Sequence, residues 1–551
     1  MWAHGVGALG GSFIDGDEEA ARILDQPGLS NLPSLGQELR GSISLYVLEH
    51  DKDQVTLLPD PLGGGIVFTH RDEDGWAASS DLGALVDFLR SIGRGPRKSL
   101  EYVAAYVATG SGGLVDSSYE GIEALPQFSY IEITPNGFTV KDYAAKQSFY
   151  ATEESYDDSL ARAEEEIKLN LRALASGDHS RKVAHLTGGI DSRAVLAAIL
   201  STGNGDQFSF YCSGGPTEPD QVIARQLATE YGLIMTKAQG TEPTVAPETQ
   251  EEQLLWRFQH TSGLISGPMH RGNTRSSTAI ASGGYGELFR SFHNKGIPHV
   301  GNPQEVAQKI FGGLGFSTNA SRRLLSRDFA DRTQARLQNH IVKSEGKGVR
   351  RDALLDHVYM SSRNRFFVGE ITRSVSPFAA RFDPLYSLAG ASLALRLDGA
   401  SRVANIVGMD LIERMSPGLS RLPFDRDRFS GAYAQVREVP ATRDFSKQGG
   451  PLFDGMVSEP AGNAGLVKVP KPTVEERLRA NELKMAPRLI AEFPATRDGI
   501  KDLIAGMTGS RFESAFNSRA VTLLVDRPPS HRVHYRTARS IYASLLWYHR
   551  G

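Results

Sequence analysis

One glycine-containing segment carries the residue types needed to bind a polyanion. Residues 183–193 read VAHLTGGIDSR, a short apolar run followed by two glycines, two hydroxyl side chains and an acid. The glycines let the backbone approach a ligand, Thr187 and Ser192 offer hydroxyl donors, and a helix beginning here directs its amides at the same point. Asp191 would repel a phosphate unless Mg²⁺ bridged the two. The pattern favours a magnesium-complexed phosphate, against the simpler alternative of a turn capped by Asp191.

Two further segments have a similar form. Residues 278–281 (TAIA) predict a strand, and residues 282–290 (SGGYGELFR) follow it with three glycines and the acid Glu287. Residues 208–212 (FSFYC) predict another strand, followed by Ser213 and by Asp220. Asp220 either flanks a ligand or caps the next helix, and the sequence leaves both alternatives open.

Strands and helices must alternate to position these segments. Leucine and isoleucine at helical spacing predict a helix over residues 158–175. Strands at 183–186 and 208–212 then alternate with helices at 192–200 and 220–231. Strict alternation favours a parallel sheet with helices on both faces, whose ligands bind at the carboxyl ends of its strands. The chemistry is therefore expected in the loops after Leu186, Cys212 and Ala281.

The remaining regions differ in character. Short apolar runs separated by Asp, Gly and Pro predict a β-rich region over residues 1–148, with strands near 43–48, 55–58 and 66–69. From about residue 300 the pattern is mainly helical, with segments near 303–311, 351–367 and 385–397. Residues 437–472, rich in Gly, Pro and Ser, predict a long loop.

Composition excludes several classes of protein. The chain has 551 residues, and 61 Lys+Arg against 64 Asp+Glu give a net charge of −3, which argues against a nucleic-acid partner. No run of about 18 apolar residues indicates a membrane span, and no leader pattern precedes the first strand, so we expect a cytoplasmic protein. The single cysteine, Cys212, allows no internal disulfide and is most simply a small buried apolar residue.

Residues 187–192 resemble the SGGxDS pyrophosphate loop of the PP-loop ATP pyrophosphatases, with Thr187 in place of Ser, and their surroundings resemble the asparagine synthetase branch. Residues 282–289 resemble that family's second loop, SGxGxDExF, but are one residue shorter and lack the Asp before Glu287. The resemblance implies ATP and Mg²⁺ as cofactors and Asp191 and Glu287 as metal ligands. It implies nucleotide binding by Leu186, Thr187, Gly188, Gly189, Asp191, Ser192, Arg193, Ser213, Asp220, Ser282, Gly283, Gly284 and Gly286.

The resemblance also implies the fold and the domains. It predicts an α/β protein with an amino-terminal αββα sandwich of the Ntn type over residues 1–150. Residues 151–551 would form a PP-loop, parallel-sheet synthetase domain with helical additions.

Residues on the acceptor side resemble the family less closely. Tyr285 and Glu370 match a dyad that deprotonates the attacking amine in ring-closing members, although Glu370 could equally pair with Arg365 or Arg373 on a helix face. Residues 377–378 and Asp383 resemble a Pro-Phe-x-Asp segment, with extra residues. The family also uses a late lysine as a charge clamp, for which Lys447 is the best match, ahead of Lys468 and Lys471.

The chain begins Met1-Trp2, where glutamine-dependent asparagine synthetases have the cysteine that releases ammonia from glutamine. An indole cannot act as that nucleophile. Segments such as Pro59-Asp60-Pro61-Leu62-Gly63 still resemble the glutaminase domain. The resemblance therefore implies a glutaminase domain that keeps its fold without its activity, as in β-lactam and carbapenam synthetases and lasso-peptide cyclases.

These observations predict an ATP-dependent, AMP-forming carbon–nitrogen ligase. It would adenylate a substrate carboxylate and join it to an amine from a source other than glutamine, including by cyclisation to a lactam or a peptide macrolactam in natural-product biosynthesis. The expected partners are a small-molecule or peptide substrate, with no nucleic acid and no membrane; a pathway partner protein and a homodimer are left open. The alternative is a catalytically inactive nucleotide-binding scaffold of the same fold.

Overall fold

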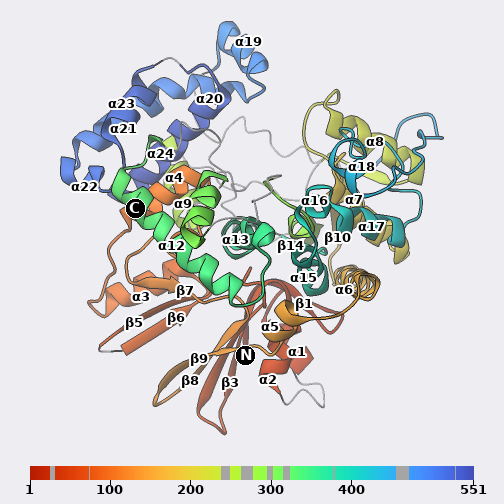
Figure 1. Ribbon diagram of the computed structural model, residues 1–551, viewed down its shortest axis with the longest axis horizontal. Coiled ribbons are helices and arrows are strands. Elements are labelled where there is room, and N and C mark those ends of the chain that lie inside the picture. Colours follow the sequence, from red (N-terminus) through yellow and green to blue (C-terminus); the bar gives the residue numbers. More distant parts are fainter. Residues whose placement is uncertain are drawn as a thin grey trace.

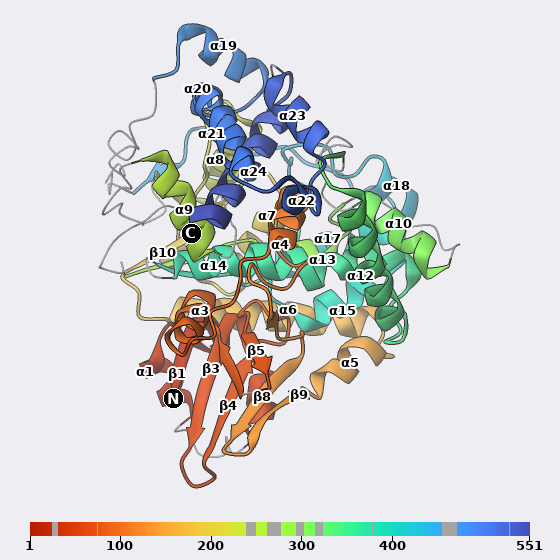
Figure 2. The same cartoon turned by 90° about the vertical axis from the view of Figure 1, so that its left-hand side faces the viewer.

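The computed structural model shows an α/β protein with one parallel sheet and two antiparallel sheets (Figures 1 and 2). It describes residues 1–24, 31–73, 75–237, 249–261, 277–293, 302–313, 323–376, 379–454, 471–527 and 529–550. The antiparallel sheets lie together at the amino-terminal end of the colour range, and the later helices gather away from them (Figure 2).

The amino-terminal region is built from two antiparallel sheets. The 6-stranded sheet has the order β2-β1-β3-β4-β8-β9, and the 3-stranded sheet has the order β6-β5-β7. The strands are β1 (Trp2–Leu9), β2 (Ser12–Ile14), β3 (Arg40–Glu49), β4 (Gln54–Pro59), β5 (Phe68–Asp72), β6 (Gly75–Ser79), β7 (Ile122–Ala124), β8 (Ser129–Thr134) and β9 (Gly137–Asp142).

Alternating side chains give the larger sheet two buried faces. Leu58 packs in a cluster with residues of α1 (Asp17–Leu24) and α2 (Leu32–Gly36). Its neighbour Leu57 points the other way, into a cluster with Val67, which precedes β5, and with Ala78 of β6. Helices α3 (Leu82–Ser91) and α4 (Leu100–Thr109) share a core with Phe68 of that smaller sheet. The packing thus places helices outside both sheets.

The parallel sheet has the order β14-β13-β10-β11-β12-β15. Its strands are β10 (Arg181–His185), β11 (Ser209–Tyr211), β12 (Ile234–Thr236), β13 (Thr278–Ala281), β14 (Ala380–Phe382) and β15 (Leu452–Phe453). From β10 the chain steps outward through β11 to β12, and it then crosses to β13 on the other side of β10. Ala184 of β10, Ala281 of β13 and Phe382 of β14 lie side by side in register. The strand order therefore reverses between β10 and β13.

Helices surround these sheets. Among the described residues they include α5 (Ala145–Ala151), α6 (Tyr156–Ser176), α7 (Ile190–Ser201), α8 (Pro219–Tyr231), α9 (Gln250–His260), α10 (Pro303–Gly313), α12 (Arg327–Glu345), α13 (Leu354–Tyr359), α14 (Glu370–Val375), α15 (Leu388–Arg396), α16 (Gly399–Val403), α17 (Ile406–Met415), α18 (Ala432–Val436), α19 (Val474–Glu482), α20 (Pro487–Ala491), α21 (Phe493–Ala505), α22 (Gly509–Glu513), α23 (Ser518–Asp526) and α24 (Arg532–Arg550). Short helical turns are η1 (Gly205–Gln207), η2 (Gly286–Phe289) and η3 (Arg351–Ala353). None of the helices within these described ranges is both long and apolar enough to cross a bilayer.

The alternating strands and helices of the middle region are confirmed, with boundaries within about two residues. The helical segment near 351–367 is also confirmed, and its later part is a π-helix, η4 (Met360–Gly369), directly after α13. One expectation needs correction. The strand expected at 66–69 begins only at Phe68, because a loop containing Gly63, Gly64 and Gly65 precedes it. Of the predicted loop 437–472, residues 455–470 lie outside the described part.

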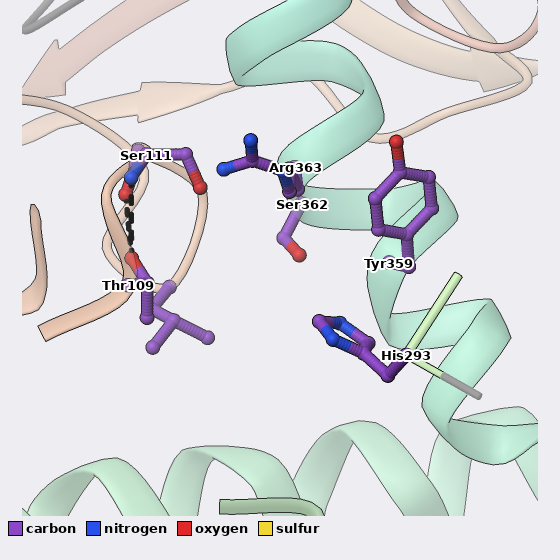
Figure 3. A pocket seen from close by; sticks show the side chains of 8 residues that line it. Thr109, Ser111, His293, Tyr359, Ser362 and Arg363 are labelled. Carbon is purple, nitrogen blue, oxygen red and sulfur yellow. Dashed lines mark hydrogen bonds between the residues drawn. The ribbon is translucent and has the colours of Figure 1, made fainter. Parts of the chain in front are cut away.

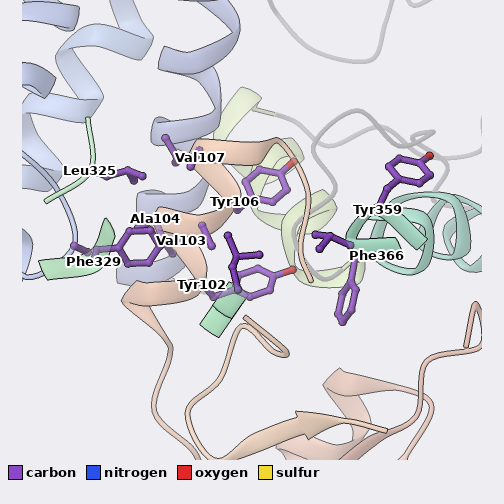
Figure 4. Close-up of a cluster of buried hydrophobic side chains, with 14 of the residues drawn as sticks. Tyr102, Val103, Ala104, Tyr106, Val107, Leu325, Phe329, Tyr359 and Phe366 are labelled. Carbon is purple, nitrogen blue, oxygen red and sulfur yellow. The ribbon is translucent and has the colours of Figure 1, made fainter. Parts of the chain in front are cut away.

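One apolar core joins the two halves of the chain. Figure 4 shows Tyr102 and Val103 of α4 in the same cluster as Tyr359 and Phe366 from the later half. The carboxy-terminal helix α24 also packs on α4, where Lys98 donates a hydrogen bond to the carbonyl of Trp547 at 2.9 Å. The amino-terminal half is therefore bound into the core of the molecule.

A buried acid, Asp60, lies at the boundary between the halves. Its carboxylate accepts hydrogen bonds from the backbone amides of Gly64 and Gly65 and from the hydroxyl of Tyr386, at 3.0, 2.6 and 3.0 Å. The Tyr386 hydroxyl also accepts from the Leu62 amide at 2.8 Å. Burial raises the pKa of Asp60 to about 6 in spite of these hydrogen bonds.

The raised pKa of Asp60 predicts a pH-dependent contribution to stability. Below about pH 4 the carboxyl is protonated in both folded and unfolded chains, and its contribution is fully present. As pH rises through about 6, the unfolded chain has already lost the proton that the folded chain holds, so stability falls by about 3 kcal/mol. The Asp60→Asn variant should not show this loss of stability with rising pH.

Chemical denaturation at pH 4.5, 5.5 and 7 gives the unfolding free energies of wild type and of Asp60→Asn. The difference between these two free energies tests the prediction. That difference should change with pH, whereas Asp87→Asn, at an exposed site, should stay parallel to wild type. Parallel pH profiles for Asp60→Asn and wild type would contradict the assignment.

Candidate functional site

Two glycine-containing loops meet at the point where the strand order reverses. The first follows β10 and the second follows β13, and these strands are paired and parallel. In open parallel sheets, ligands bind in the crevice that opens at such a point, outside the carboxyl ends of the strands. The loops after Leu186 and Ala281 thus lie at the place where such a crevice forms, as the alternation of strands and helices predicts.

The first loop is held by its own hydroxyl groups. The Thr187 and Ser192 hydroxyls lie 3.0 Å apart, and the Gly189 amide donates to the Thr187 hydroxyl at 3.1 Å. Gly189 precedes α7 and provides no side-chain cap, which leaves the first amides of this 12-residue helix available to an anion. A Cβ on Gly188 would lie 2.6 Å from the Cβ of Asp425, so only glycine fits there.

The second loop packs directly against Asp191. A Cβ on Gly286 would lie 3.0 Å from the Cβ and Cγ of Asp191, and one on Gly283 would lie 3.1 Å from its backbone carbon. Between these glycines Tyr285 has φ of +65°, in the left-handed region that costs a non-glycine residue energy. The glycines therefore permit the close approach of the two loops.

Three charged side chains gather where the loops meet. Arg290 donates to Asp191 at 3.2 Å. Glu287 is half-buried, and its buried Oε2 has no hydrogen-bond partner among the described residues. Burial, followed by the charge of Asp191, raises the pKa of Glu287 to about 7. The site thus holds two neighbouring carboxyl groups, one of them with an unsatisfied oxygen.

These two carboxyls fit the Mg²⁺ that the resemblance implies. Mg²⁺ is usually held by one or two carboxylates together with substrate phosphates and waters. Within the described ranges no cluster of three or more His, Cys, Asp or Glu is arranged to hold a metal. Asp191 and the unsatisfied Glu287 would supply protein oxygens, and the triphosphate would supply the rest.

The loop after β11 borders a larger cavity. Asp220, at the start of α8, accepts a hydrogen bond from the Gly188 amide at 2.9 Å, so it braces the first loop. Ser213 lies on the rim of a cavity of about 260 Å³, which β11, β12 and β15 line at their carboxyl ends with Tyr211, Thr236 and Phe453. The cavity lies beside the crevice on the β11 side. Cys212 is buried, and burial raises the pKa of its thiol to about 11.

Arg193 does not face the crevice. Its guanidinium is buried, donates to the carbonyls of Leu422 and Pro423 at 2.7 and 2.6 Å, and lies 3.6 Å from the ring centroid of Phe424. Burial lowers its pKa to about 9. Arg193 therefore holds the segment that packs on Gly188, and the expectation of direct nucleotide contact is corrected to support of the loop.

Tyr285 and Glu370 make no hydrogen bond to each other among the described residues. The Tyr285 hydroxyl is fully buried and lies 3.4 Å from the Ser42 hydroxyl of β3, with its ring 4.7 Å from that of Tyr386. Glu370 is also buried and pairs with Arg373 at 2.8 Å, as the simpler alternative for this residue predicts. The two side chains do not form the expected dyad.

If the chain has the synthetase activity that the resemblance implies, Tyr285→Phe is therefore expected to leave both AMP formation and amide formation within about twofold of wild type. The hydroxyl contacts the amino-terminal half, and its loss should change stability by about 1 kcal/mol or less. Steady-state assays of the two products with one substrate pair test this. Loss of amide formation with retained AMP formation would contradict this expectation and show that Tyr285 acts in the step that forms the amide.

Lys447 lies away from the two loops. Its backbone amide donates to Glu230 at 3.0 Å, near the end of α8. Asp220, which contacts the first loop, is ten residues earlier in the same helix, about 15 Å along its axis. The structure thus does not bring Lys447 to the crevice. Lys471 is also exposed, and Lys468 and residues 377–378 lie outside the described part.

The structure adds Arg381 to the site and brings Asp383, which the sequence placed on the acceptor side, to the second loop. Asp383 accepts a hydrogen bond from the Gly284 amide at 3.1 Å, and Arg381 donates to the Ser282 hydroxyl at 3.1 Å. Arg381 also donates to Asp383 at 3.2 Å. The register of β14 beside β13 brings this pair to the second loop, a relation between segments about 100 residues apart that no local pattern reveals.

The sequence matches no protein-family model and, at a significant level, no curated protein.

Proposed function

We propose that this chain is an ATP-dependent, AMP-forming amide synthetase similar to asparagine synthetase. Its parallel-sheet region would be a PP-loop domain, and its amino-terminal region would be an Ntn-type αββα domain without glutaminase activity. The single observation that carries the proposal is the meeting of two glycine loops around Asp191 at the strand-order reversal, beside the uncapped start of α7.

The crevice supports binding of a triphosphate. The amides of α7 and the hydroxyls of Thr187 and Ser192 suit phosphate oxygens, and the neighbouring cavity of about 260 Å³ suits a nucleoside. Mg²⁺ would neutralise the phosphates and polarise the α-phosphorus. Arg290 pairs with Asp191, and the remaining donors of its guanidinium would suit phosphate oxygens.

The reaction would proceed in two displacements. A substrate carboxylate oxygen attacks the α-phosphorus, and the bond to pyrophosphate breaks. An amine nitrogen then attacks the acyl carbon, AMP leaves with the bonding electrons, and the nitrogen loses a proton.

The amine comes from a source other than glutamine. Trp2 is 54% exposed on β1 and has no nucleophilic atom in place of a thiolate. We expect either an amine within the substrate itself, giving a lactam or a macrolactam, or a second small molecule.

The direct test supplies ATP, Mg²⁺ and a panel of carboxylic acids, and measures AMP and pyrophosphate. Hydroxylamine in the same reaction would trap an acyl-adenylate as a hydroxamate, even when the natural amine is unknown. Carboxylate-dependent release of AMP and pyrophosphate in equal amounts supports the proposal. Release of ADP and phosphate would contradict it.

One observation favours a second candidate, a nucleotide-binding scaffold without catalysis. The ion pair between Arg290 and Asp191 already neutralises the carboxylate that would face Mg²⁺. For a scaffold, ATP binding measured by calorimetry should occur, with no AMP formed from any acid of the panel. Arg290→Gln distinguishes the two candidates. In an enzyme it should make the rate of AMP formation depend more strongly on the Mg²⁺ concentration, whereas in a scaffold it should only weaken ATP binding.

A further inference from the structure

The side chain of Tyr285 leaves the second loop and enters the amino-terminal half. It is fully buried, and its hydroxyl oxygen lies 3.4 Å from the hydroxyl oxygen of Ser42 on β3. Its ring centroid lies 4.7 Å from that of Tyr386. Tyr285 therefore connects a loop of the parallel sheet to a strand of the amino-terminal half.

A small socket in the amino-terminal half receives the Tyr285 hydroxyl. A Cβ on Gly64 would lie 2.0 Å from that hydroxyl oxygen, 2.8 Å from the Ser42 hydroxyl oxygen and 3.3 Å from the Gly41 carbonyl oxygen. The φ of Gly64 lies outside the left-handed region, so it is the shortage of space that excludes a side chain there, and not the backbone conformation. We call Gly41, Ser42 and Gly64 the Tyr285 socket.

Hydrogen bonds and close packing hold the socket in place. The Gly64 amide and the Tyr386 hydroxyl both donate to the buried carboxylate of Asp60, each at 3.0 Å. The π-helix η4 also packs on the socket, since a Cβ on Gly369 would lie 2.5 Å from the Gly64 carbonyl oxygen. Because these neighbours restrain Gly64, a methyl group added there is expected to displace Tyr285.

The position of Tyr285 bears on the proposed phosphate site. The Gly284 amide, one residue before it, donates to Asp383 at 3.1 Å. A Cβ on Gly286, one residue after it, would lie 3.0 Å from the Cβ and Cγ of Asp191. Tyr285 itself has φ of +65°, a conformation that persists only where the surroundings hold it. A displaced Tyr285 ring would therefore move the part of the second loop that packs against Asp191.

We propose that the Tyr285 socket positions the second loop, with Gly64 as a positioning residue for the phosphate site. The glycine leaves room for the hydroxyl, and the buried ring then fixes the backbone between Gly284 and Gly286. The part of this inference that concerns phosphate binding rests on the proposed function. It gives the amino-terminal half a role in the synthetase that requires no glutaminase activity.

A second contact between the two halves supplies a matched control. Figure 3 shows Ser111, in the loop after α4, opposite Ser362 of η4. A Cβ on Gly112 of that loop would lie 2.5 Å from the Tyr102 hydroxyl oxygen and 3.0 Å from the ring of Phe366. Gly112→Ala therefore places the same methyl group against another buried tyrosine, and the atoms nearest to that methyl group belong to Tyr102 and Phe366.

Hydrogen exchange of the full chain, followed by mass spectrometry of peptides that cover residues 282–290, measures how firmly the second loop is held. Gly64→Ala should raise exchange there by about tenfold or more, because the displaced tyrosine loosens the loop. The double variant Gly64→Ala with Tyr285→Phe should return to within about threefold of wild type. In that variant the tightest remaining contact is the Ser42 hydroxyl at 2.8 Å, which can rotate away.

Calorimetric titration with pyrophosphate and Mg²⁺ measures the consequence for the phosphate site. Gly64→Ala should weaken pyrophosphate binding about tenfold, and the added Tyr285→Phe should recover it. Gly112→Ala should bind pyrophosphate as wild type does, with or without Tyr285→Phe. Thermal melting of each variant checks that it folds, and if Gly64→Ala alone does not fold, the double variant should.

The proposal is overturned if Gly64→Ala leaves exchange of the second loop as in wild type, or if Tyr285→Phe does not reverse its effect. It is also overturned if Tyr285→Phe corrects Gly112→Ala equally well. Hydrogen exchange is measured without ligand, so it decides the role of the socket independently of the synthetase activity. Wild-type protein that fails to bind pyrophosphate would instead contradict the proposed function.

Discussion

Asp191→Asn is expected to lower AMP formation by about 100-fold or more. Asp191 is one of the two neighbouring carboxyl groups that would face the phosphates in the proposed synthetase, and its loss would remove a protein oxygen for the cation. The variant also leaves Arg290 without its 3.2 Å partner. The protein should fold, because the Asp191 side chain is 25% exposed and carries no structural hydrogen bond besides this pair among the described residues.

Initial rates over a Mg²⁺ titration measure the effect. A matched control is Asp331→Asn on α12, an acid with a 68% exposed side chain, which should retain the wild-type rate. If Asp191→Asn keeps a rate within about threefold of wild type at low Mg²⁺, Asp191 does not serve the cation. The double variant Asp191→Asn with Arg290→Gln distinguishes the effect of losing the carboxylate from the effect of leaving Arg290 unpaired.

Arg402→Met is expected to destabilise the protein by about 3–5 kcal/mol, because it leaves a buried acid without its cation. Arg402 is 1% exposed and donates to Asp356 at 2.9 Å. Burial raises the pKa of Asp356 even with the arginine present. The Arg402 carbonyl accepts from the Ser291 amide at 3.0 Å, so the network also supports the end of the second loop.

Chemical denaturation of Arg402→Met should show this loss. The matched control is Arg350→Met, since Arg350 pairs with Asp352 at 3.1 Å while its side chain is 44% exposed, and its replacement should cost about 1 kcal/mol or less. The double variant Arg402→Met with Asp356→Leu should be more stable than Arg402→Met alone, because the unpaired acid is removed. Equal stability of the single and double variants would contradict the buried-charge explanation.

Local sequence patterns were sufficient to predict the strands and helices of the middle region and the first glycine-containing loop. Helical spacing over residues 158–175 predicts α6, and the alternation of apolar runs predicts β10, α7, β11 and α8. These predictions succeed because hydrophobic periodicity and glycine at the ends of elements are local features of the chain. The positions of Gly188 and Gly189 follow from the same reasoning. The composition likewise predicts a chain without a disulfide framework, since Cys212 is its single cysteine.

Side-chain direction depended on the tertiary structure. Arg193 follows the first loop by one residue, yet the helical turn directs it to the carbonyls near Phe424. Tyr285 lies within the second loop, yet its left-handed backbone directs its hydroxyl toward Ser42. Glu370 is satisfied by Arg373, three residues later on the same helix. Each direction is set by partners that the local sequence does not identify.

The sequence by itself determined which residue types follow each strand, because loop chemistry is local. Only the tertiary structure decided which of those loops meet. The reversal of strand order places Asp191, Glu287 and Arg290 together, and the register of β14 adds Arg381 and Asp383. The close approach of Gly113 to Ser362 packs the loop after α4 against η4. Such contacts depend on the packing of segments hundreds of residues apart, which no spacing along the chain encodes.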